Sequence, residues 1–470
     1  MTNRIKFGTD GWRAIIAKDF TVENVAAVSL ACAAWIHNKY KNPKVVVGFD
    51  TRFGGALFAE TVSKVLASKG IEVITSTTFV PTPAVSYAIT ALDACFGIVI
   101  TASHNPYDYS GYKLKGSHGG PLIEEDIRNV ENLINPEAEI DLEQVNLDSM
   151  VEKGLIKYTD LEKLYTDHLK QSFKLDLIAN SRFRFAFDPM FGSGQNIMKK
   201  ILPNVKSIND KPDPYFNYTS PEPLARNLKD YLKFIKDEGN IDCGLAVDGD
   251  ADRIALVNSK GEYIDSHHVI LLLIHYLGGY RSLTGKIITG FSSTVKIEKL
   301  ATHYNLEVER VKIGFKDISK HMLKEDVLVG GEESGGIGVK GHIPERDGVW
   351  MGLLIWQFMA ETNKSLETLI EEVYSITGSF AFERSDLHID KDLKYRVIEK
   401  CKNDEFTKFG SYLVKEKLDF DGFKYVFDEN TWLMIRPSGT EPVLRTYAEA
   451  ATKEEALLIL EEARKIIMEC

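Results

Sequence analysis

The chain has 470 residues, 44% of them hydrophobic and 27% charged, which is typical of a globular protein with roughly three or four domains. Its net charge of −11 excludes a broad nucleic-acid-binding surface, so an anionic ligand would need a local positive pocket. The five cysteines include no closely spaced pair, which argues against a disulfide framework or a zinc site. With no signal-peptide pattern and no membrane-spanning run, we expect a cytoplasmic protein without a membrane partner.

The first forty residues combine a polar loop with a helix. Two glycines enclose Thr9 and Asp10, which predicts a tight loop rather than a regular element. Arg13, just after this loop, is a candidate ligand for an anion, although most arginines simply lie at the surface. Apolar residues at helical spacing then predict a helix over 21–40, with Thr21 as its N-cap.

A pattern of strand, polar loop and helix occurs three times along the chain. The first strand of each copy is expected at 44–50, 183–188 and 286–291. A second strand in each copy runs into its most polar loop, and these strands are expected at 97–100, 244–247 and 327–329. Because the pattern recurs at a spacing of about a hundred residues, it predicts three related α/β units.

The C-terminal part of the chain follows a different pattern. It contains an expected helix over 391–402, an extended segment over 425–435 and an amphipathic helix over 453–468. This combination predicts a small α+β domain. We therefore expect four domains, at 1–154, 155–258, 259–377 and 378–470.

The second strand of the first unit ends in a reactive combination of side chains. The β-branched run 98–100 stops at a loop that holds Ser103, His104 and Asn105, followed by Pro106. Open α/β sheets place their ligands at such carboxyl ends of strands. The alternative interpretation is an ordinary polar turn after a buried strand.

Three aspartates alternate in the corresponding loop of the second unit. In an extended loop, Asp248, Asp250 and Asp252 would point the same way and would repel one another unless a cation lay among them. The spacing resembles a calcium loop, but Arg253 and Ser259 occupy the positions that need glycine and glutamate. The pattern therefore indicates Mg²⁺, and the alternative is a solvated acidic turn.

Two further loops carry groups suited to a sugar phosphate. Glu332 and Ser334, in a glycine-rich loop, can accept from and donate to sugar hydroxyls, although a glycine-rich turn alone explains the pattern. A second set of residues offers a guanidinium, hydroxyls and free backbone amides to a phosphate. It consists of Arg436, Ser438, Gly439 and Thr440. The alternative is an ordinary basic turn, which is common. Together the four loops provide what phosphoryl transfer needs, which is positioning and charge neutralisation.

The motifs at 101–106, 248–253, 330–336 and 436–442 read TASHNP, DGDADR, GGEESGG and RPSGTEP. With the opening FGTDGWR, they closely resemble the α-D-phosphohexomutase family, in the family's order and over essentially the whole chain. The resemblance implies an α/β fold, with three related α/β domains with mixed sheets and a smaller C-terminal α+β domain around one central cleft. It also implies a hexose monophosphate substrate, and we expect a monomer or a homodimer.

The resemblance implies a role for each matching residue. Ser103 would be the phosphoserine, and it would hold one Mg²⁺ per chain together with Asp248, Asp250 and Asp252. The residues expected to line the transfer site are Arg13, His104, Lys113 and Arg253. Glu332 and Ser334 would bind O3 and O4 of the sugar, and Gly314 and Lys316 would also contact the substrate. The phosphate that does not move would be held by Arg436, Ser438, Gly439 and Thr440.

The implied reaction interconverts glucose 1-phosphate and glucose 6-phosphate, with glucose 1,6-bisphosphate as intermediate and activator. Two positions depart from the family pattern. Ser110 stands where asparagine is frequent, and Gly336 stands near the place where enzymes acting on glucosamine phosphate usually have histidine. The second departure speaks against glucosamine phosphate as the substrate and leaves glucose favoured over mannose.

Several alternatives remain open at this point. The substrate could be mannose phosphate, or both sugars. Outside the family, the chain could be a Mg²⁺-dependent sugar phosphatase or a sugar-phosphate-binding protein without catalysis. His104 and Lys113 are both possible general bases. A hinged last domain would let the site accept either end of the sugar.

Overall fold

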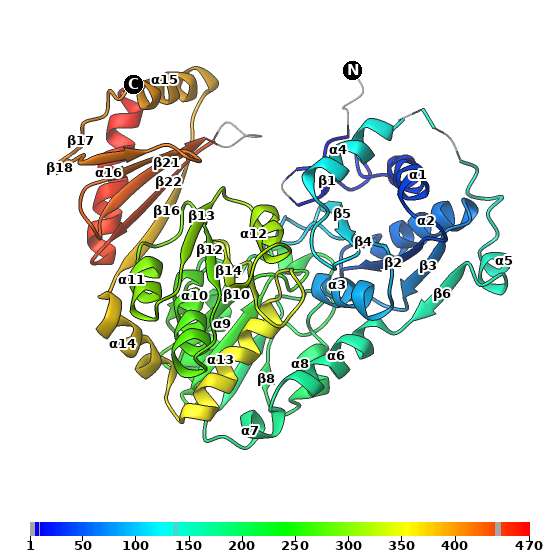
Figure 1. Cartoon of the computed structure of the whole chain (residues 1–470), viewed down its shortest axis with the longest axis horizontal. Helices are drawn as coiled ribbons and strands as arrows, with labels where there is room; N and C mark the ends of the chain where they lie inside the picture. The colour runs from blue at the N-terminus through cyan, green and yellow to red at the C-terminus, as the bar shows by residue number, and fades with distance from the viewer. Residues whose placement is uncertain (1–4, 9, 136, 139, 438–442) are drawn as a thin grey trace.

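The computed structural model describes residues 5–8, 10–135, 137–138, 140–437 and 443–470. Each of its four domains is built on a sheet of its own (Figure 1). Ser438, Gly439 and Thr440 lie outside the described residues. Among the helices that are described, none combines the length and the apolar character needed to cross a membrane.

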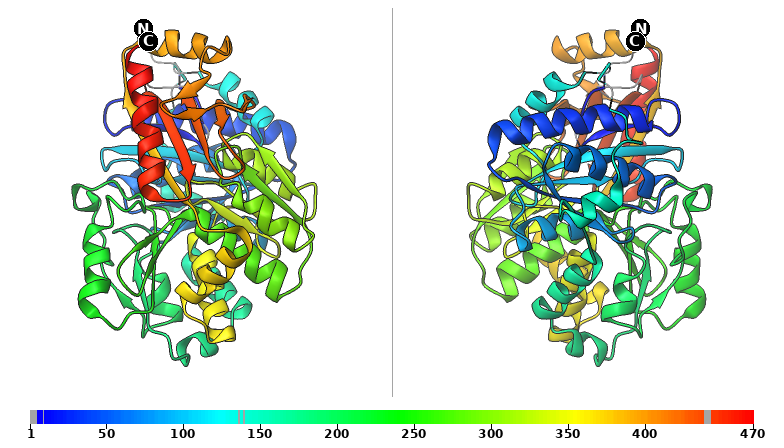
Figure 2. Two further views of the ribbon diagram at one scale, coloured as in Figure 1. Left: turned by 90° about the vertical axis from the view of Figure 1, so that its left-hand side faces the viewer. Right: turned by 90° about the vertical axis from the view of Figure 1, so that its right-hand side faces the viewer.

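The first domain contains a six-stranded mixed sheet. In sheet order its strands are β1 (Trp12–Ile15), β5 (Tyr109–Gly116), β4 (Phe96–Ile100), β2 (Lys44–Phe49), β3 (Glu72–Ser76) and β6 (Ile156–Thr159). Its helices are α1 (Val22–Lys39), α2 (Gly55–Ser68), α3 (Thr82–Ala91), α4 (Glu124–Leu133) and α5 (Leu147–Glu152). Because strand side chains alternate between faces, Val45 and Val47 pack with α1 and α2, whereas Val46 packs with α3. Figure 2 shows α1 along the outside of this domain.

The second domain contains a five-stranded sheet. In sheet order its strands are β11 (Tyr263–Ile264), β10 (Ile254–Asn258), β9 (Cys243–Val247), β7 (Phe185–Asp188) and β8 (Lys206–Ser207). The helices of this part of the chain are α6 (Leu161–Ser172), α7 (Leu175–Ala179), α8 (Ile197–Ile201), η1 (Phe216–Tyr218) and α9 (Lys229–Glu238).

The third domain contains a four-stranded sheet. In sheet order its strands are β13 (Val308–Val311), β12 (Lys286–Gly290), β14 (Val327–Gly331) and β15 (Ile337–Val339). Its helices are α10 (Ser266–Ile274), η2 (His275–Tyr280), α11 (Lys296–His303), α12 (Phe315–Met322), α13 (Gly348–Thr362) and α14 (Leu366–Thr377).

The first three domains place their polar loops at equivalent points. In each, a strand from the parallel part of the sheet turns back into an antiparallel partner, from β4 to β5, β9 to β10 and β14 to β15. The polar loops predicted to carry the chemistry make these three connections. One apolar core continues from α3 through Phe185 and Trp356 to α10, so the three domains pack as one body.

The C-terminal domain is smaller and its main sheet is antiparallel. In sheet order the strands are β16 (Ala381–His388), β22 (Val443–Ala450), β21 (Trp432–Pro437), β20 (Phe423–Val426) and β19 (Glu416–Leu418), beside a separate pair, β17 (Lys408–Phe409) and β18 (Tyr412–Leu413). Its helices are α15 (Lys391–Lys402) and α16 (Lys453–Met468), and Figure 2 shows α16 against the sheet. The domain contacts the third domain through Phe291, which packs with Trp432 and Tyr447.

Most predicted elements are confirmed to within two residues, and α15 and α16 have the predicted ends. The amide of Gly8 donates to the carbonyl of Gly11 at 2.9 Å, which fits the predicted tight loop, and β1 follows directly, pairs with β5 and buries Trp12. One prediction was wrong. The segment 425–435 is two strands, since Phe427 and Thr431 close a hairpin through a 2.9 Å backbone hydrogen bond. The first two sheets also extend past the predicted boundaries, through β6 and β11.

Candidate functional site

Ser103 lies at the end of β4 in a tightly held loop. Its amide donates to Thr101 Oγ1 at 2.9 Å, and Thr101 Oγ1 donates to Asp50 Oδ2 at 2.6 Å. The φ of Ser103 is +51°, a left-handed conformation that a serine adopts only when its surroundings impose it. The hydroxyl is therefore held in place rather than free to follow a flexible turn.

Arg52 imposes that conformation. Its Nη2 donates to the carbonyl oxygens of Ser103 at 2.6 Å and Asn105 at 2.7 Å, and its Nη1 donates to those of Pro106 and Tyr109 at 2.6 and 3.0 Å. Its own charge is balanced by Asp50, 3.1 Å from Nε. The sequence analysis missed Arg52. The available signal was a pair of charged residues, Asp50 and Arg52, directly after a buried strand.

The serine of the first domain meets the aspartates of the second. Ser103 Oγ donates to Asp248 Oδ2 at 2.6 Å, although the two residues are 145 positions apart. His104 Nδ1 lies 3.4 Å from the same Oγ. The structure thus brings together the two loops that the sequence analysis placed in one site.

The three aspartates gather through a turn, not through the extended loop that was predicted. Ala251 has a φ of +57°, and the amides of Asp252 and Arg253 donate to Asp248 Oδ1 at 2.9 and 3.0 Å. The three carboxylates are fully buried and offer oxygens within 4.8 Å of one another. Asp250 Oδ1 and Asp252 Oδ1 have no hydrogen-bond partner within the described chain. Buried oxygens of this kind fit a hard divalent cation such as Mg²⁺.

Two buried cations balance these carboxylates. Lys113 Nζ lies 2.8 Å from both Asp250 Oδ2 and Asp252 Oδ2 and 2.7 Å from Asp10 Oδ2. Arg346 Nη2 lies 2.7 Å from Asp252 Oδ2 and 2.5 Å from Asp10 Oδ2. Burial disfavours the charge of Lys113, but the surrounding carboxylates outweigh it and raise its pKa. The sequence analysis missed Asp10 and Arg346, whose partners are far away in the chain.

Arg13 and Arg253 lie beside the serine loop and the aspartate loop. Arg13 Nη1 donates to Asn105 Oδ1 at 2.6 Å, and Arg253 Nη1 lies 3.3 Å from Glu222 Oε1. Arg253 Nε is buried and has no partner among the described residues. Arginine side chains in such positions are suited to an added phosphoryl group.

The loop after β14 joins the same site from the third domain. The carbonyl of Gly335 accepts from the amide of Ile254 at 3.0 Å, which attaches this loop to the end of the aspartate loop. Ser334 Oγ lies 3.4 Å from Glu332 Oε2. Burial raises the pKa of Glu332 to about 7. The loop therefore offers a carboxyl and a hydroxyl close to the aspartates.

A second segment of the third domain reaches both neighbouring domains. Lys316, which follows Gly314 at the start of α12, donates from Nζ to the carbonyl of Gly8 at 2.8 Å. The amide of Ile313 donates to Asp421 Oδ2 of the C-terminal domain at 2.7 Å. Arg436, at the end of β21, contacts the same aspartate at 3.3 Å. Of the predicted phosphate-binding residues, only Arg436 lies within the described chain.

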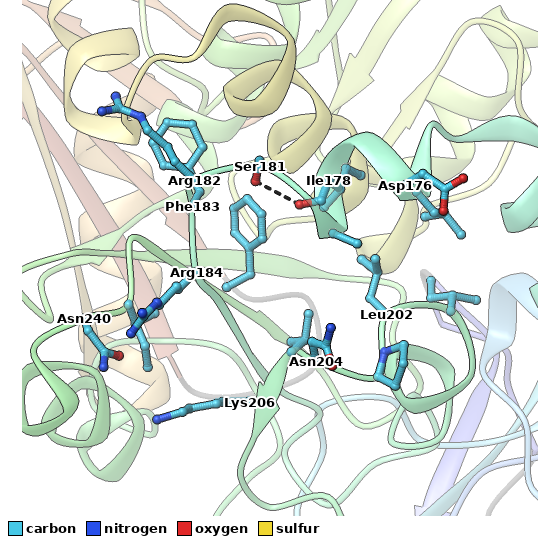
Figure 3. Close-up of a pocket in the computed structure, with 17 residues that line it drawn as sticks. Asp176, Ile178, Ser181, Arg182, Phe183, Arg184, Leu202, Asn204, Lys206 and Asn240 are labelled. Carbon is cyan, nitrogen blue, oxygen red and sulfur yellow. Dashed lines mark hydrogen bonds between the residues drawn. The ribbon is translucent and has the colours of Figure 1, made fainter.

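A cavity of about 710 Å³ in the second domain lies away from these groups (Figure 3). Phe183, Phe185 and Leu202 line it, with Arg184 and Lys206 at one side. None of the predicted site residues lines this cavity. We therefore assign the candidate site to the converging loops and not to this cavity.

Comparison with known families matches all four domains. The matching descriptions are phosphoglucomutase/phosphomannomutase domain I at residues 4–141, domain II at 163–261, domain III at 265–376 and the C-terminal domain at 396–466.

Similar proteins extend over the same length. A phosphoglucomutase/phosphomannomutase of Thermococcus kodakarensis is 30% identical over 98% of both chains. A phosphoglucosamine/phosphogalactosamine mutase of Sulfurisphaera tokodaii is 29% identical, also over 98% of both. Among solved structures, a candidate phosphomannomutase from Thermus thermophilus superposes with a TM-score of 0.87, at 31% identity and with 100% of both chains covered.

Proposed function

The chain belongs to the phosphoglucomutase/phosphomannomutase family of phosphohexomutases, and from this premise we propose that it interconverts glucose 1-phosphate and glucose 6-phosphate through Ser103. Phosphohexomutases are isomerases that move a phosphoryl group within a hexose phosphate. The observation that carries the residue assignment is the contact of 2.6 Å between Ser103 Oγ and Asp248 Oδ2, in a site of buried charges.

In the proposed first half-reaction, phosphorylated Ser103 gives its phosphoryl group to the free hydroxyl of the bound sugar. The bond from phosphorus to Ser103 Oγ breaks as a bond from phosphorus to the sugar oxygen forms. The proton of the sugar hydroxyl passes to a base, and Ser103 Oγ leaves with the electron pair and takes up a proton, which restores the serine hydroxyl. The product is glucose 1,6-bisphosphate. After this intermediate turns round, Ser103 takes a phosphoryl group from its other end, and the isomeric monophosphate leaves.

Of the two candidate bases, His104 is the one that lies beside the reacting hydroxyl without a proton to lose, with Nδ1 3.4 Å from Ser103 Oγ. Burial, assisted by Arg253 and Arg13, lowers the pKa of His104 well below its ordinary value, which keeps the imidazole neutral but also makes it a weak base. The raised pKa of Lys113 keeps its ammonium charged, so it cannot accept a proton. Lys113 is better suited to balancing the negative charge of the aspartates and of the phosphoryl group.

The residues that would hold Mg²⁺ are Asp248, Asp250, Asp252 and phosphorylated Ser103. When bound, the ion would supply positive charge to the phosphoryl group. The unpartnered oxygens of Asp250 and Asp252 support this assignment. Arg13 and Arg253 would contact the same phosphoryl group from the other loops.

The remaining predicted residues would orient the sugar. Glu332 and Ser334 would bind two of its hydroxyls, and Gly314 and Lys316 would lie beside it. The phosphate that does not move would be bound by Arg436, Ser438, Gly439 and Thr440. This division of labour leaves one group of residues for transfer and another for recognition.

Two other hexoses compete with glucose as substrate. The named activities of the similar proteins include phosphomannomutase and phosphoglucosamine mutase. Gly336, in place of the histidine expected near it for glucosamine, supports glucose. Mannose phosphate is the second candidate, because the same Glu332 and Ser334 would bind its O3 and O4.

A substrate panel tests the proposal. The 1-phosphates of glucose, mannose and glucosamine are each supplied with Mg²⁺ and catalytic glucose 1,6-bisphosphate, and kcat/KM is measured for the 6-phosphate formed. We expect the highest value for glucose, and loss of turnover when EDTA removes the metal. Higher kcat/KM for another sugar would overturn the substrate assignment, and steady release of inorganic phosphate without isomer would indicate a phosphatase.

A further inference from the structure

Asp421 belongs to none of the four motifs, yet it contacts two of the loops proposed to bind substrate. It lies in the turn between β19 and β20. Its Oδ2 accepts the backbone amide of Ile313 at 2.7 Å. Both of its oxygens face Arg436, with Nε 3.4 Å from Oδ1 and Nη2 3.3 Å from Oδ2.

The two contacts of Asp421 differ in strength. The bond from Ile313 has the length of a good hydrogen bond. The paired contacts to Arg436 are longer than the 2.7–2.9 Å typical of charge-assisted bonds, and both side chains are 20% exposed. Asp421 thus fixes the direction of the guanidinium while leaving it open to a phosphate.

The turn that carries Asp421 packs closely on Arg436. Gly422 has a φ of +108°, and a Cβ atom there would lie 3.2 Å from Arg436 Cβ and Cγ. On the other side of Asp421, the ring of Phe420 contacts the ring of Phe291 in the third domain, with centroids 5.9 Å apart. The carboxylate therefore has little freedom to leave its place between the two domains.

The segment held by Asp421 continues to the first domain. Three residues after Ile313, Lys316 Nζ contacts the carbonyl of Gly8 at 2.8 Å. Between them, Gly314 has a φ of +140° and no atom near its missing Cβ. The segment 313–316 thus links the C-terminal domain to the first domain across the third.

We infer that Asp421 is a positioning residue: it orients the guanidinium of Arg436 toward the phosphate of the substrate and couples that guanidinium to the segment 313–316. The inference rests on the proposed function, in which Arg436 binds the phosphate that does not move. A phosphate is bound by the N–H groups of the guanidinium that Asp421 leaves free, while Asp421 keeps its contacts to Arg436 and Ile313. Capture of the phosphate is in this way tied to the segment that lies beside the sugar.

Two substitutions separate the two contacts. Asp421→Ala removes both, and we expect KM for glucose 1-phosphate to rise about tenfold with kcat changed less than about twofold, because the binding group is misplaced but the reacting groups are not. Asp421→Asn keeps an oxygen for the Ile313 amide and removes the charge, so KM should rise by only about threefold. Asp419→Asn, two residues away and exposed, is the matched control and should leave both constants unchanged.

A double-mutant cycle and hydrogen exchange decide the role. In the background of Arg436→Ala, adding Asp421→Ala should raise KM no further, because Asp421 acts through Arg436. The peptide that contains Ile313 should exchange its amides faster in Asp421→Ala than in Asp421→Asn. The inference would be overturned if Asp421→Ala raised KM as much in the Arg436→Ala background as in the wild type. Unchanged exchange of the Ile313 peptide in Asp421→Ala would also overturn it. If the wild type converts no hexose phosphate, the proposed function fails, and the exchange measurement alone decides the contact with Ile313.

Discussion

The residues proposed to transfer the phosphoryl group and those proposed to recognise the second phosphate have different surroundings. Around Ser103, the three aspartates of the loop 248–253, Lys113 and Arg346 are at most 4% exposed. The contacts from Ser103 to Asp248, from Lys113 to Asp250 and from Arg346 to Asp252 are 2.6, 2.8 and 2.7 Å long. Around Arg436, the ion pair with Asp421 is 3.3 Å long and one-fifth exposed. Rigid, dry charges suit the transfer step, because they need not reorganise as charge moves. A looser, more exposed pair suits the proposed role of Arg436, which would release one phosphate and bind the other when the intermediate turns round.

Removing the hydroxyl of Ser103 should have the largest effect, because it removes the proposed phosphoryl acceptor. We expect Ser103→Ala to lower kcat by about four orders of magnitude or more, because no other group accepts the phosphoryl. Binding of glucose 1-phosphate, measured by calorimetry, should change little. Intact-mass measurement of the wild type should locate one added phosphoryl group on Ser103. Substantial mutase activity in the variant, or a label on another residue, would contradict the assignment.

Removing the charge of Lys113 should lower the stability of the protein, because this charge lies among the buried carboxylates beside Ser103. Lys113→Met leaves Asp10, Asp250 and Asp252 with less compensation, and breaking a buried pair costs about 3–5 kcal/mol in the free energy of unfolding. Urea denaturation measures this loss, and added Mg²⁺ should recover more stability in the variant than in the wild type. Lys163→Met is the control, since its pair with Asp167 is at the surface and its loss should not be measurable. Equal stability of the two variants would contradict the buried network.

Glu332 provides a pH test at the boundary between the two groups of residues. Its pKa is raised from an ordinary 4.5 to about 7 by burial, so between these values the folded protein keeps a proton that the unfolded chain has released. The contribution of Glu332 to the free energy of unfolding should therefore be greatest below pH 4.5. It should fall as the pH rises to about 7 and stay constant above that pH. Urea midpoints from pH 5 to 8 should show this slope in the wild type and a smaller slope in Glu332→Gln. Parallel profiles would assign the slope to other groups.

Replacing Arg436 by lysine should have the smallest effect of the four. The variant keeps a positive charge but loses the planar fork that can grip a phosphate with two hydrogen bonds. We expect KM for glucose 1-phosphate to rise about fivefold, near 1 kcal/mol, with kcat almost unchanged. A large fall in kcat instead would place Arg436 in the transfer step and remove the contrast between the two groups of residues.

The sequence predicted the parts of the site whose signal is local. Ser103 and the three aspartates follow buried strands, and the structure places those strand ends together because each domain repeats one connection. The turn at Ala251 was not foreseen, since an extended loop and this turn group the same carboxylates. The hairpin in 425–435 was missed although Asp428, Glu429 and Asn430 separate its two apolar runs, because the sequence analysis did not use this polar turn signal.

The compensating charges could not be predicted in the same way. Arg346 contacts Asp10, 336 positions away, and no local pattern marks either residue as a partner of the other. For Arg52 the only local signal was its neighbour Asp50, because its other partners are carbonyl oxygens, which every residue has. Asp421 was hidden for a related reason, because its tightest bond is to a backbone amide.

The burial of Ser103, which is 1% exposed, would affect how long the proposed phosphoserine lasts. A phosphoryl ester kept from bulk water is shielded from hydrolysis between turnovers. Phosphorylated Ser103 would then persist in the resting enzyme. Trace amounts of the sugar bisphosphate would suffice to phosphorylate Ser103 again in the few molecules that have lost the phosphoryl group.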